Sequence, residues 1–187
     1  MPNYPARGDI ASAKALLDSA GIKPDANGVR IRAILDLIPY GEDWRRAGEY
    51  LKQVLGDIGI KLELRYEDVP TWLKRIYHNY DFVMNVNYFY QLPDPVLGVH
   101  RHYGTDQIRK GTHFVNSSRY SNSELDELLA SGATEANAQK RTQIYKKIQE
   151  ILARDMPVVN LFELQFLTVY NTKLKGAYNS ALGALSL

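Results

Sequence analysis

The sequence predicts an α/β fold in which a mostly parallel sheet is flanked by helices. Apolar and charged residues alternate over residues 29–37 and 60–67, which indicates strands. Between them, residues 42–58 carry an apolar stripe with helical spacing. A short helical segment and a third apolar stretch, residues 81–88, follow. Strand, helix, strand, helix and strand with short connections are typical of right-handed crossovers and therefore of a parallel sheet.

The helices of this first half begin and end at residues that favour helix termini. Apolar residues recur at helical spacing over residues 10–20, and Gly21 is a typical C-terminal stop. The turn-forming composition of residues 23–28 predicts a loop before the first strand. Glu42 and Asp43 suit the first turn of the next helix, because the helix dipole favours negative charge there.

The second half of the chain is less regular. Residues 89–119 show no clear periodicity, and a loop of that length in a compact domain is usually functional or misread. Residues 121–124, Ser-Asn-Ser-Glu, fit a capping box that opens a helix, and a longer helix follows it. Residues 158–162 and 166–170 are predicted to be short strands. The small, apolar tail of residues 177–187 has no obvious place in the sheet.

Composition excludes several classes of function. The chain has 187 residues, of which 45% are hydrophobic and 24% charged, as in ordinary globular domains. A net charge of +2 gives no electrostatic reason to expect a nucleic-acid partner. The absence of cysteine excludes disulfides, thiolate catalysis and cysteine-ligated metals. No uncharged run approaches the roughly 20 apolar residues that span a bilayer, and residues 1–7 lack the apolar core of a signal peptide.

A binding site is expected where the strands end, because open parallel sheets bind ligands at the carboxyl ends of their strands. The aromatic residues there offer flat faces for stacking, and Gln91 offers a neutral donor and acceptor. Successive aromatic residues alternate faces in an extended segment, so the alternative is that they pack beneath the long loop. The expected contacts are Tyr40 after the first strand and Tyr88, Phe89, Tyr90, Gln91 and Asp94 after the third.

No catalytic motif, cofactor site or metal site is expected. The nucleophile elbow, phosphate-binding loop, dinucleotide fingerprint and His-Glu-x-x-His pattern are all missing. His100 and His102 could hold a metal with His113 or Asp106, but without a recognised ligand spacing a solvated loop is the favoured interpretation. Two other functions remain open: a hydrolytic enzyme using pairs such as His100 and Asp94, and a protein-interaction domain with an aromatic surface.

Several segments, in order along the chain, resemble a known family. They are Gly59-Ile-Lys-Leu-Glu-Leu, Tyr80-Asp-Phe, Asp94-Pro, Asn116-Ser-Ser-Arg-Tyr-Ser-Asn-Ser-Glu-Leu-Asp and Lys140-Arg-x-x-x-Tyr-x-x-Ile-Gln. This pattern is similar to the extracytoplasmic solute-binding proteins of the dipeptide, oligopeptide and nickel ABC importers. The resemblance implies a periplasmic-binding-protein-like fold and a binding role rather than an enzymatic one.

The resemblance also implies an organisation and partners. Family members have two α/β lobes that close on a ligand, and residues 1–187 are expected to be a single lobe, the second one. Residues 177–187 would return toward the missing first lobe, so a lobe fragment is expected. The implied partners are a small-molecule or peptide ligand, the permease subunits of an ABC transporter and the first lobe. The implied location is periplasmic or extracytoplasmic.

The resemblance adds two candidate contacts and one departure. By similarity to the family's last strand pair, Phe162 and Glu163 are expected to contact the ligand. Trp72 is a further candidate, although a tryptophan on a helix face is more often part of the core. Peptide binders of this family often carry Asp where this chain has Gln91. A neutral amide lacks the charge-assisted hydrogen bond to a peptide ammonium, so we expect a polar solute without a recognised free α-amine.

Overall fold

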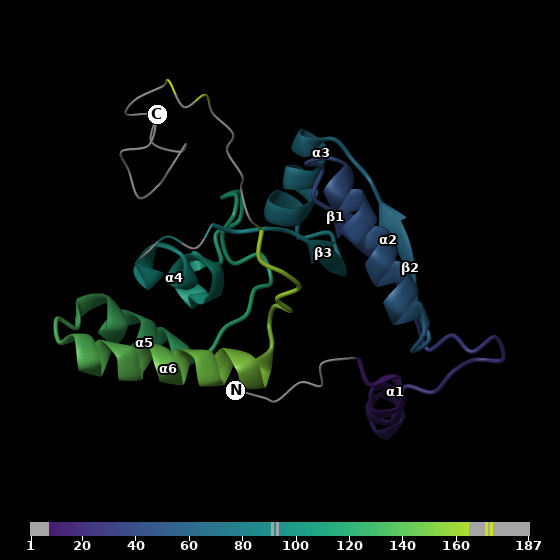
Figure 1. Ribbon diagram of the computed structural model, residues 1–187, viewed down its shortest axis with the longest axis horizontal. Helices are drawn as coiled ribbons and strands as arrows, with labels where there is room; N and C mark the ends of the chain where they lie inside the picture. The colour runs from purple at the N-terminus through teal and green to yellow at the C-terminus, as the bar shows by residue number, and fades with distance from the viewer. Residues whose placement is uncertain (1–7, 91, 93, 165–170, 172, 174–187) are drawn as a thin grey trace. The chain divides into compact units, whose positions relative to one another are not determined.

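The computed structural model describes residues 8–90, 92, 94–164, 171 and 173 (Figure 1). It divides into two compact units, residues 1–157 and residues 158–187, and each is described by itself. The expectation of a single lobe over residues 1–187 therefore stays a prediction. Among the described residues, every helix is too short or too polar to cross a bilayer.

The first unit contains the predicted parallel sheet. Its strands are β1 (Ile31–Leu37), β2 (Ile60–Arg65) and β3 (Met84–Val86), in the spatial order β2-β1-β3. The register aligns Asp36 of β1 with Arg65 of β2. The third strand is shorter than the predicted residues 81–88, because only the last three residues of β1 pair with it.

Helices cover both faces of this sheet. They are α2 (Glu42–Gly56), α3 (Val69–Leu73) and η1 (Lys74–Asn79), a π-helical continuation of α3. Leu37 packs so closely on Gly48 of α2 that a Cβ at residue 48 would overlap its side chain. The neighbouring Asp36 instead pairs with Arg75 of η1. Since adjacent strand residues point to opposite faces, α2 and η1 lie on opposite sides of β1.

The helix α1 (Ile10–Ser19) precedes the sheet and buries none of its residues. Its predicted end at Gly21 is correct, because the N–H groups of Gly21 and Ile22 donate to the carbonyls of Asp18 and Leu17. Arg30 connects this helix to the sheet by donating to the Asp18 carboxylate at 2.7 Å.

The stretch predicted as irregular, residues 89–119, contains three short helices. They are η2 (Pro95–Leu97), α4 (Val99–Tyr103) and η3 (Thr105–Gln107). Each is too short to show a 3.6-residue apolar period, so the sequence pattern does not reveal them.

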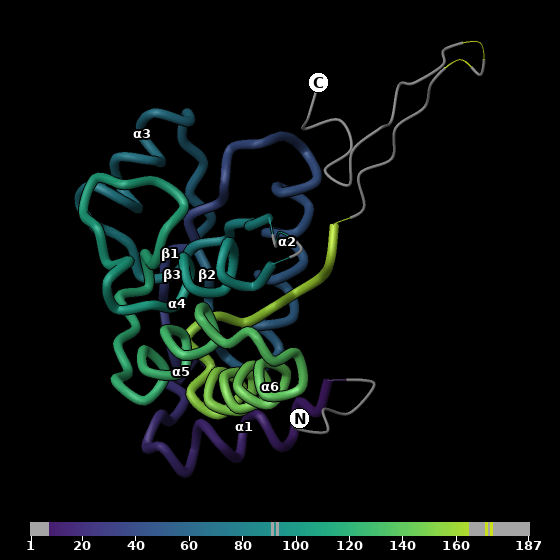
Figure 2. Tube along the Cα trace, turned by 90° about the vertical axis from the view of Figure 1, so that its left-hand side faces the viewer, coloured from purple at the N-terminus to yellow at the C-terminus, as the bar shows by residue number. Residues whose placement is uncertain are grey.

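The helices α5 (Ser123–Thr134) and α6 (Ala138–Asp155) lie side by side and enclose a second core (Figure 2). Its buried residues are Leu125, Leu129, Ile148 and Ile151. The predicted cap at Ser121 is wrong by one residue: the side chain of Asn122 accepts a hydrogen bond from the Leu125 N–H, which makes Asn122 the N-cap.

The second unit differs from its sequence-based expectation. Residues 158–162 were predicted as a strand, but they are irregular and the described residues supply no neighbouring strand to pair with them. Without such a partner a strand cannot satisfy its backbone groups. The predicted strand at residues 166–170 and the tail at residues 177–187 lie outside the described residues.

Candidate functional site

Four aromatic side chains meet where β1 and β3 end. The ring of Tyr88 lies 5.5 Å from Trp44 in a stacked arrangement, and 5.8 Å from Tyr40 edge to face. The Tyr90 ring lies 5.4 Å from that of Tyr88, again edge to face. We call Tyr40, Trp44, Tyr88 and Tyr90 the aromatic cluster. Such ring pairs contribute about 0.5–1.5 kcal/mol each beyond the area they bury.

The chain turn after β1 brings two of these rings together. Tyr40 follows the strand by three residues, and Gly41 then caps α2 with a φ of 108°. Only glycine adopts that conformation readily. The turn therefore places Trp44 in the first turn of α2, 8% exposed, beneath the rings that follow β3.

The aromatic cluster combines a buried base with an open rim. Tyr40 is 41% exposed and Tyr90 is 39% exposed, whereas Tyr88 is half-buried. Burial, together with the neighbouring Tyr90 hydroxyl, raises the pKa of Tyr88, so its phenol is neutral at physiological pH. The rim thus offers apolar ring faces and hydroxyl groups to a ligand.

The predicted alternation of residues 88–90 is present. Tyr88 and Tyr90 contact each other, while the ring of Phe89 packs on His102 of α4 at 3.7 Å between centroids. Burial lowers the pKa of His102 to about 4, and Arg101 acts in the same direction. His102 is therefore a neutral packing residue, and Phe89 secures the segment to α4 rather than joining the open rim.

Asp94 makes contacts within the chain. Its carboxylate accepts hydrogen bonds from the Val96 N–H at 2.9 Å and from Arg141 Nη2 at 2.7 Å. The bond from Arg141 is the main reason that the pKa of Asp94 lies below its ordinary value. Asp94 thus caps η2 and connects it to α6. Arg141 is half-buried where it makes this pair.

The remaining predicted contacts lie elsewhere. Trp72 is 1% exposed in the sheet core, edge to face with Tyr77 at 5.9 Å, so no solute can reach it on this surface. Trp72 occupies its helix position as a core residue, which requires no contact with a ligand. Gln91 lies outside the described residues. Phe162 and Glu163 are exposed and belong to the second unit.

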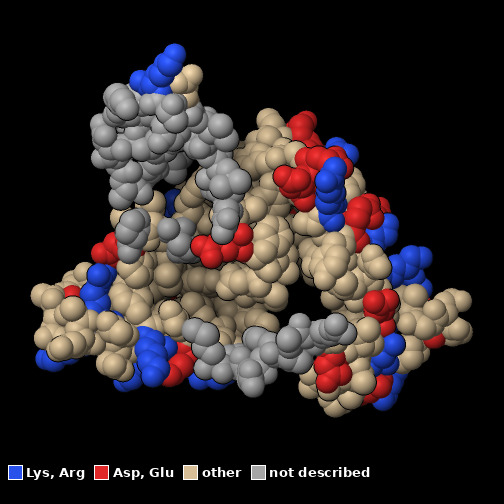
Figure 3. All heavy atoms as spheres, viewed as in Figure 1, with Lys and Arg blue, Asp and Glu red and all other residues tan. Residues whose placement is uncertain are grey.

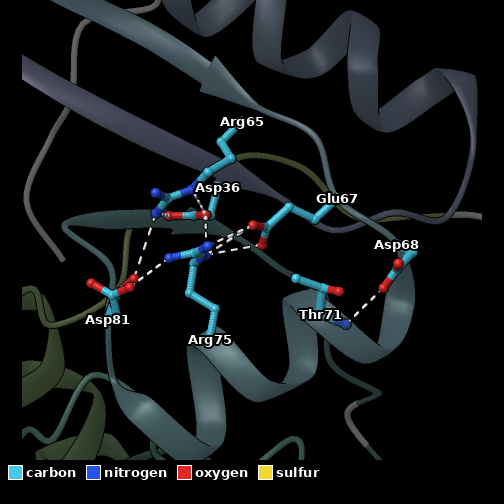
Figure 4. Close-up of polar contacts among 7 residues, drawn as sticks. All are labelled: Asp36, Arg65, Glu67, Asp68, Thr71, Arg75 and Asp81. Carbon is cyan, nitrogen blue, oxygen red and sulfur yellow. Dashed lines mark hydrogen bonds and ion pairs between the residues drawn. The ribbon is translucent and has the colours of Figure 1, made fainter.

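A second cluster at the strand ends is ionic (Figure 4). Asp36, which is fully buried, accepts two hydrogen bonds from Arg65 at 2.6 and 2.8 Å. Arg75 of η1 contacts Glu67 at 2.6 Å and Asp81 at 2.5 Å, and lies 3.8 Å from Asp36. We call Asp36, Arg65, Glu67, Arg75 and Asp81 the ion-pair cluster.

The charges of the ion-pair cluster are satisfied from within. The bonds from Arg75 are the main cause of the lowered pKa of Glu67, and the bond to Asp36 is the main cause of the raised pKa of Arg65. Asp68, beside it in Figure 4, caps α3 by accepting from the Thr71 N–H at 2.8 Å. These groups fix β1, β2 and η1 together, and each charged side chain has an oppositely charged partner within the cluster.

The histidines considered as metal ligands do not converge. The solvated loop expected here is wrong, because His100 and His102 lie on α4 and His102 is buried. His100 Nε2 pairs with Asp106 at 2.9 Å. His113 instead faces His78, a residue the sequence did not single out. Within the described ranges, no three His, Asp or Glu side chains form a metal-binding group. His100 and Asp94 have separate partners, Asp106 and Arg141.

Charge is mixed rather than concentrated. On the face shown in Figure 3, acidic and basic residues alternate over the part that α2 and β2 occupy. This mixture of signs agrees with the small net charge of the chain.

The sequence matches a known protein family and several characterised relatives. Residues 1–110 match the model of "Bacterial extracellular solute-binding proteins, family 5 Middle". The peptide transport periplasmic protein SapA of Haemophilus influenzae is 24% identical over 75% of this chain and 25% of its own length. A dipeptide-binding protein of Pseudomonas aeruginosa is 23% identical over 95% of this chain and 32% of its own.

A solved structure shares the fold. The periplasmic oligopeptide-binding protein of an ABC transporter from Thermotoga maritima, bound to mannohexaose, superposes with a TM-score of 0.68. It is 24% identical, and the match covers 83% of this chain and 31% of that one. This chain therefore spans about a third or less of the length of these relatives.

Proposed function

The chain belongs to the bacterial extracellular solute-binding proteins of family 5, and from this premise we propose that it supplies one wall of a site for a small polar organic solute. The aromatic cluster is that wall. It lies at the carboxyl ends of β1 and β3, where open parallel sheets bind ligands. The observation that carries the proposal is the exposed pair of rings, Tyr40 and Tyr90, on a buried base.

The solute that fits this wall is neutral where it touches the rings. Gln91 stands where peptide binders of the family often have Asp, and a neutral amide provides no charge-assisted bond to an ammonium group. Asp94, the acidic residue nearest to it in sequence, already binds Arg141 and the Val96 N–H. We therefore propose a peptide-like or other polar solute, such as a sugar conjugate, whose free α-amine is not recognised at this wall.

The proposed mechanism is reversible capture. A second lobe closes over the solute, the closed form delivers it to the permease of an ABC importer, and no bond is made or broken. The relatives named as periplasmic transport proteins support an extracytoplasmic location. A hydrolytic alternative has less support, because His100 pairs with Asp106 and Asp94 pairs with Arg141.

The test uses the parent protein with both proposed lobes. Solutes that co-purify with it are identified by mass spectrometry, and calorimetry then compares a dipeptide with its N-acetylated counterpart. We expect acetylation to change affinity by less than about threefold, because no charged bond to the amine is lost. Tight binding that requires the free amine would contradict the proposed solute class. Recovery of the solute in a hydrolysed form would favour the enzyme instead.

A further inference from the structure

The helix η1 and the loop after η3 bring two histidines together. His78 Nε2 and His113 Nε2 are 3.0 Å apart, although 35 residues separate them in the sequence. Their ring centroids are 5.2 Å apart, and both side chains are exposed. The chain has four histidines. The other two, His100 and His102, contact Asp106 and Phe89 instead.

The loop that carries His113 is fixed on both sides of that residue. Before it, the Gly111 N–H donates to the carbonyl of Tyr77, the residue preceding His78, at 2.8 Å. After it, the ring of Phe114 lies 5.7 Å from the ring of Tyr77. Tyr77 itself is 1% exposed in the sheet core. The two imidazoles are therefore held in place by backbone and core contacts rather than only by each other.

We propose that His78 and His113 form a bis-imidazole site for a late first-row transition-metal dication such as Zn²⁺. Metal–nitrogen bonds of about 2.0–2.1 Å place two adjacent ligands on one ion roughly 2.9–3.4 Å apart. The observed separation of 3.0 Å lies within that range. Imidazole nitrogen is a preferred ligand for these ions. No third His, Asp or Glu joins the pair among the described residues, so water completes the coordination.

Metal binding replaces the contact between the two rings. In the neutral pair, one Nε2–H donates to the other Nε2 lone pair. A metal needs both Nε2 lone pairs, so the donor ring moves its proton to Nδ1, and no proton is released and no electron is transferred. The bound ion then joins the loop around His113 to η1. Neither histidine belongs to the aromatic cluster, so this site shares no side chain with the proposed solute wall.

The test is calorimetric titration of the tag-free chain with Zn²⁺, using Mg²⁺ as a hard-cation control. We expect one Zn²⁺ per chain, and no response to Mg²⁺. His78→Gln and His113→Gln should each weaken Zn²⁺ binding by at least about tenfold, because each removes one of two ligands. His100→Gln is the matched control and should leave the affinity unchanged. Equal loss in His100→Gln, or no loss in one of the two ligand variants, would overturn the proposal.

A spectroscopic measurement on the unmodified chain tests the same site without depending on whether a variant folds. Long-range ¹H–¹⁵N correlation spectra of the unmodified chain resolve the imidazole nitrogens of the four histidines. We expect Zn²⁺ to move the Nε2 resonances of His78 and His113 together, with saturation at one equivalent. Movement confined to His100 and His102, or no movement of either proposed ligand, would overturn the proposal.

Discussion

The two clusters at the strand ends of the sheet differ in what they leave available. In the ion-pair cluster, Asp36 is fully buried, and each charged group faces an opposite charge on the same chain. In the aromatic cluster, Trp44 is buried but the rings of Tyr40 and Tyr90 keep about two-fifths of their surface exposed. The first cluster is complete within the chain, whereas the second has unfilled contact area.

This difference shows that location at a strand end does not by itself make a binding site. Both clusters use residues from the end of β1 or just after it. The pairing of β1 with β2 brings the ion-pair cluster together, and the pairing of β1 with β3 brings the aromatic cluster together. A site also requires side-chain surface that the chain itself leaves exposed, as the rings of Tyr40 and Tyr90 do. Substitutions in the two clusters should therefore affect different properties. Those in the ion-pair cluster should lower stability, and those in the aromatic cluster should lower solute affinity.

The largest expected effect is from Asp36→Ala. The substitution leaves Arg65 and Arg75 without their buried partner, and their side chains are only 26% and 22% exposed. We expect a loss of about 3 kcal/mol in the free energy of unfolding, because removal of one partner from a buried pair leaves an uncompensated charge. Urea denaturation measures it.

A matched substitution on the same strand is Arg32→Ala. Arg32 pairs with Asp25 at 2.9 Å, but both side chains are about half exposed. The free energy of unfolding should change by less than about 1 kcal/mol. Equal losses in the two variants would mean that the ion-pair cluster does not stabilise the sheet as described.

Gly48→Ala tests the packing that separates the two faces of β1. A Cβ at this position overlaps the Leu37 side chain, so the helix or the strand must move. We expect a loss of about 2 kcal/mol, typical of overpacking. Gly56→Ala on the same helix meets no atom within 4 Å and should be neutral or stabilising. Destabilisation by Gly56→Ala but not by Gly48→Ala would contradict the assigned faces.

The burial of His102 against Phe89 predicts that the free energy of unfolding depends on pH. Its pKa falls from 6.5 to about 4 on folding, so the unfolded chain binds this proton first as the pH decreases. The free energy of unfolding should therefore decrease from about pH 6.5 to about pH 4, by about 2–3 kcal/mol from this group. Denaturation at several pH values measures the slope, and His102→Leu should reduce it. An unchanged slope in that variant would assign the pH dependence to other groups.

Substitutions at the rim should have only a small effect on stability. Tyr40→Ser and Tyr90→Ser each remove one ring contact, so each should cost less than about 1.5 kcal/mol of stability. In the parent protein, calorimetry should show solute affinity falling about three- to tenfold for each variant, because each lost stacking contact contributes a similar energy. Tyr50→Ser, which changes a 65% exposed residue of α2, is the control and should change neither property.

Much of the fold could be predicted because the sheet and its helices have clear periods. The alternation in residues 60–65 and the stripe of α2 correspond directly to the observed elements. The short helices between Pro95 and Gln107 could not be predicted, since one turn carries no period. The cap at Asn122 was misplaced by one residue because Ser121 and Asn122 are both good capping residues.

The aromatic cluster could be predicted in part. Tyr40, Tyr88 and Tyr90 follow strands directly, and parallel pairing of β1 with β3 brings the ends of those strands together. Trp44 was missed as a member because it also fits the apolar stripe of α2; its position in the first turn after Gly41 was the available signal. The contact between His78 and His113 could not be predicted, because it depends on how the loop folds over η1.

The most direct test of the account is a crystal structure of the parent protein closed on the solute that co-purifies with it. We predict that the intact solute lies against the exposed faces of Tyr40 and Tyr90. No carboxylate of residues 1–157 should accept a hydrogen bond from an amine of the solute. A solute bound without contact to either ring, or cleaved within the site, would contradict the central claim that the open aromatic rim captures it unchanged.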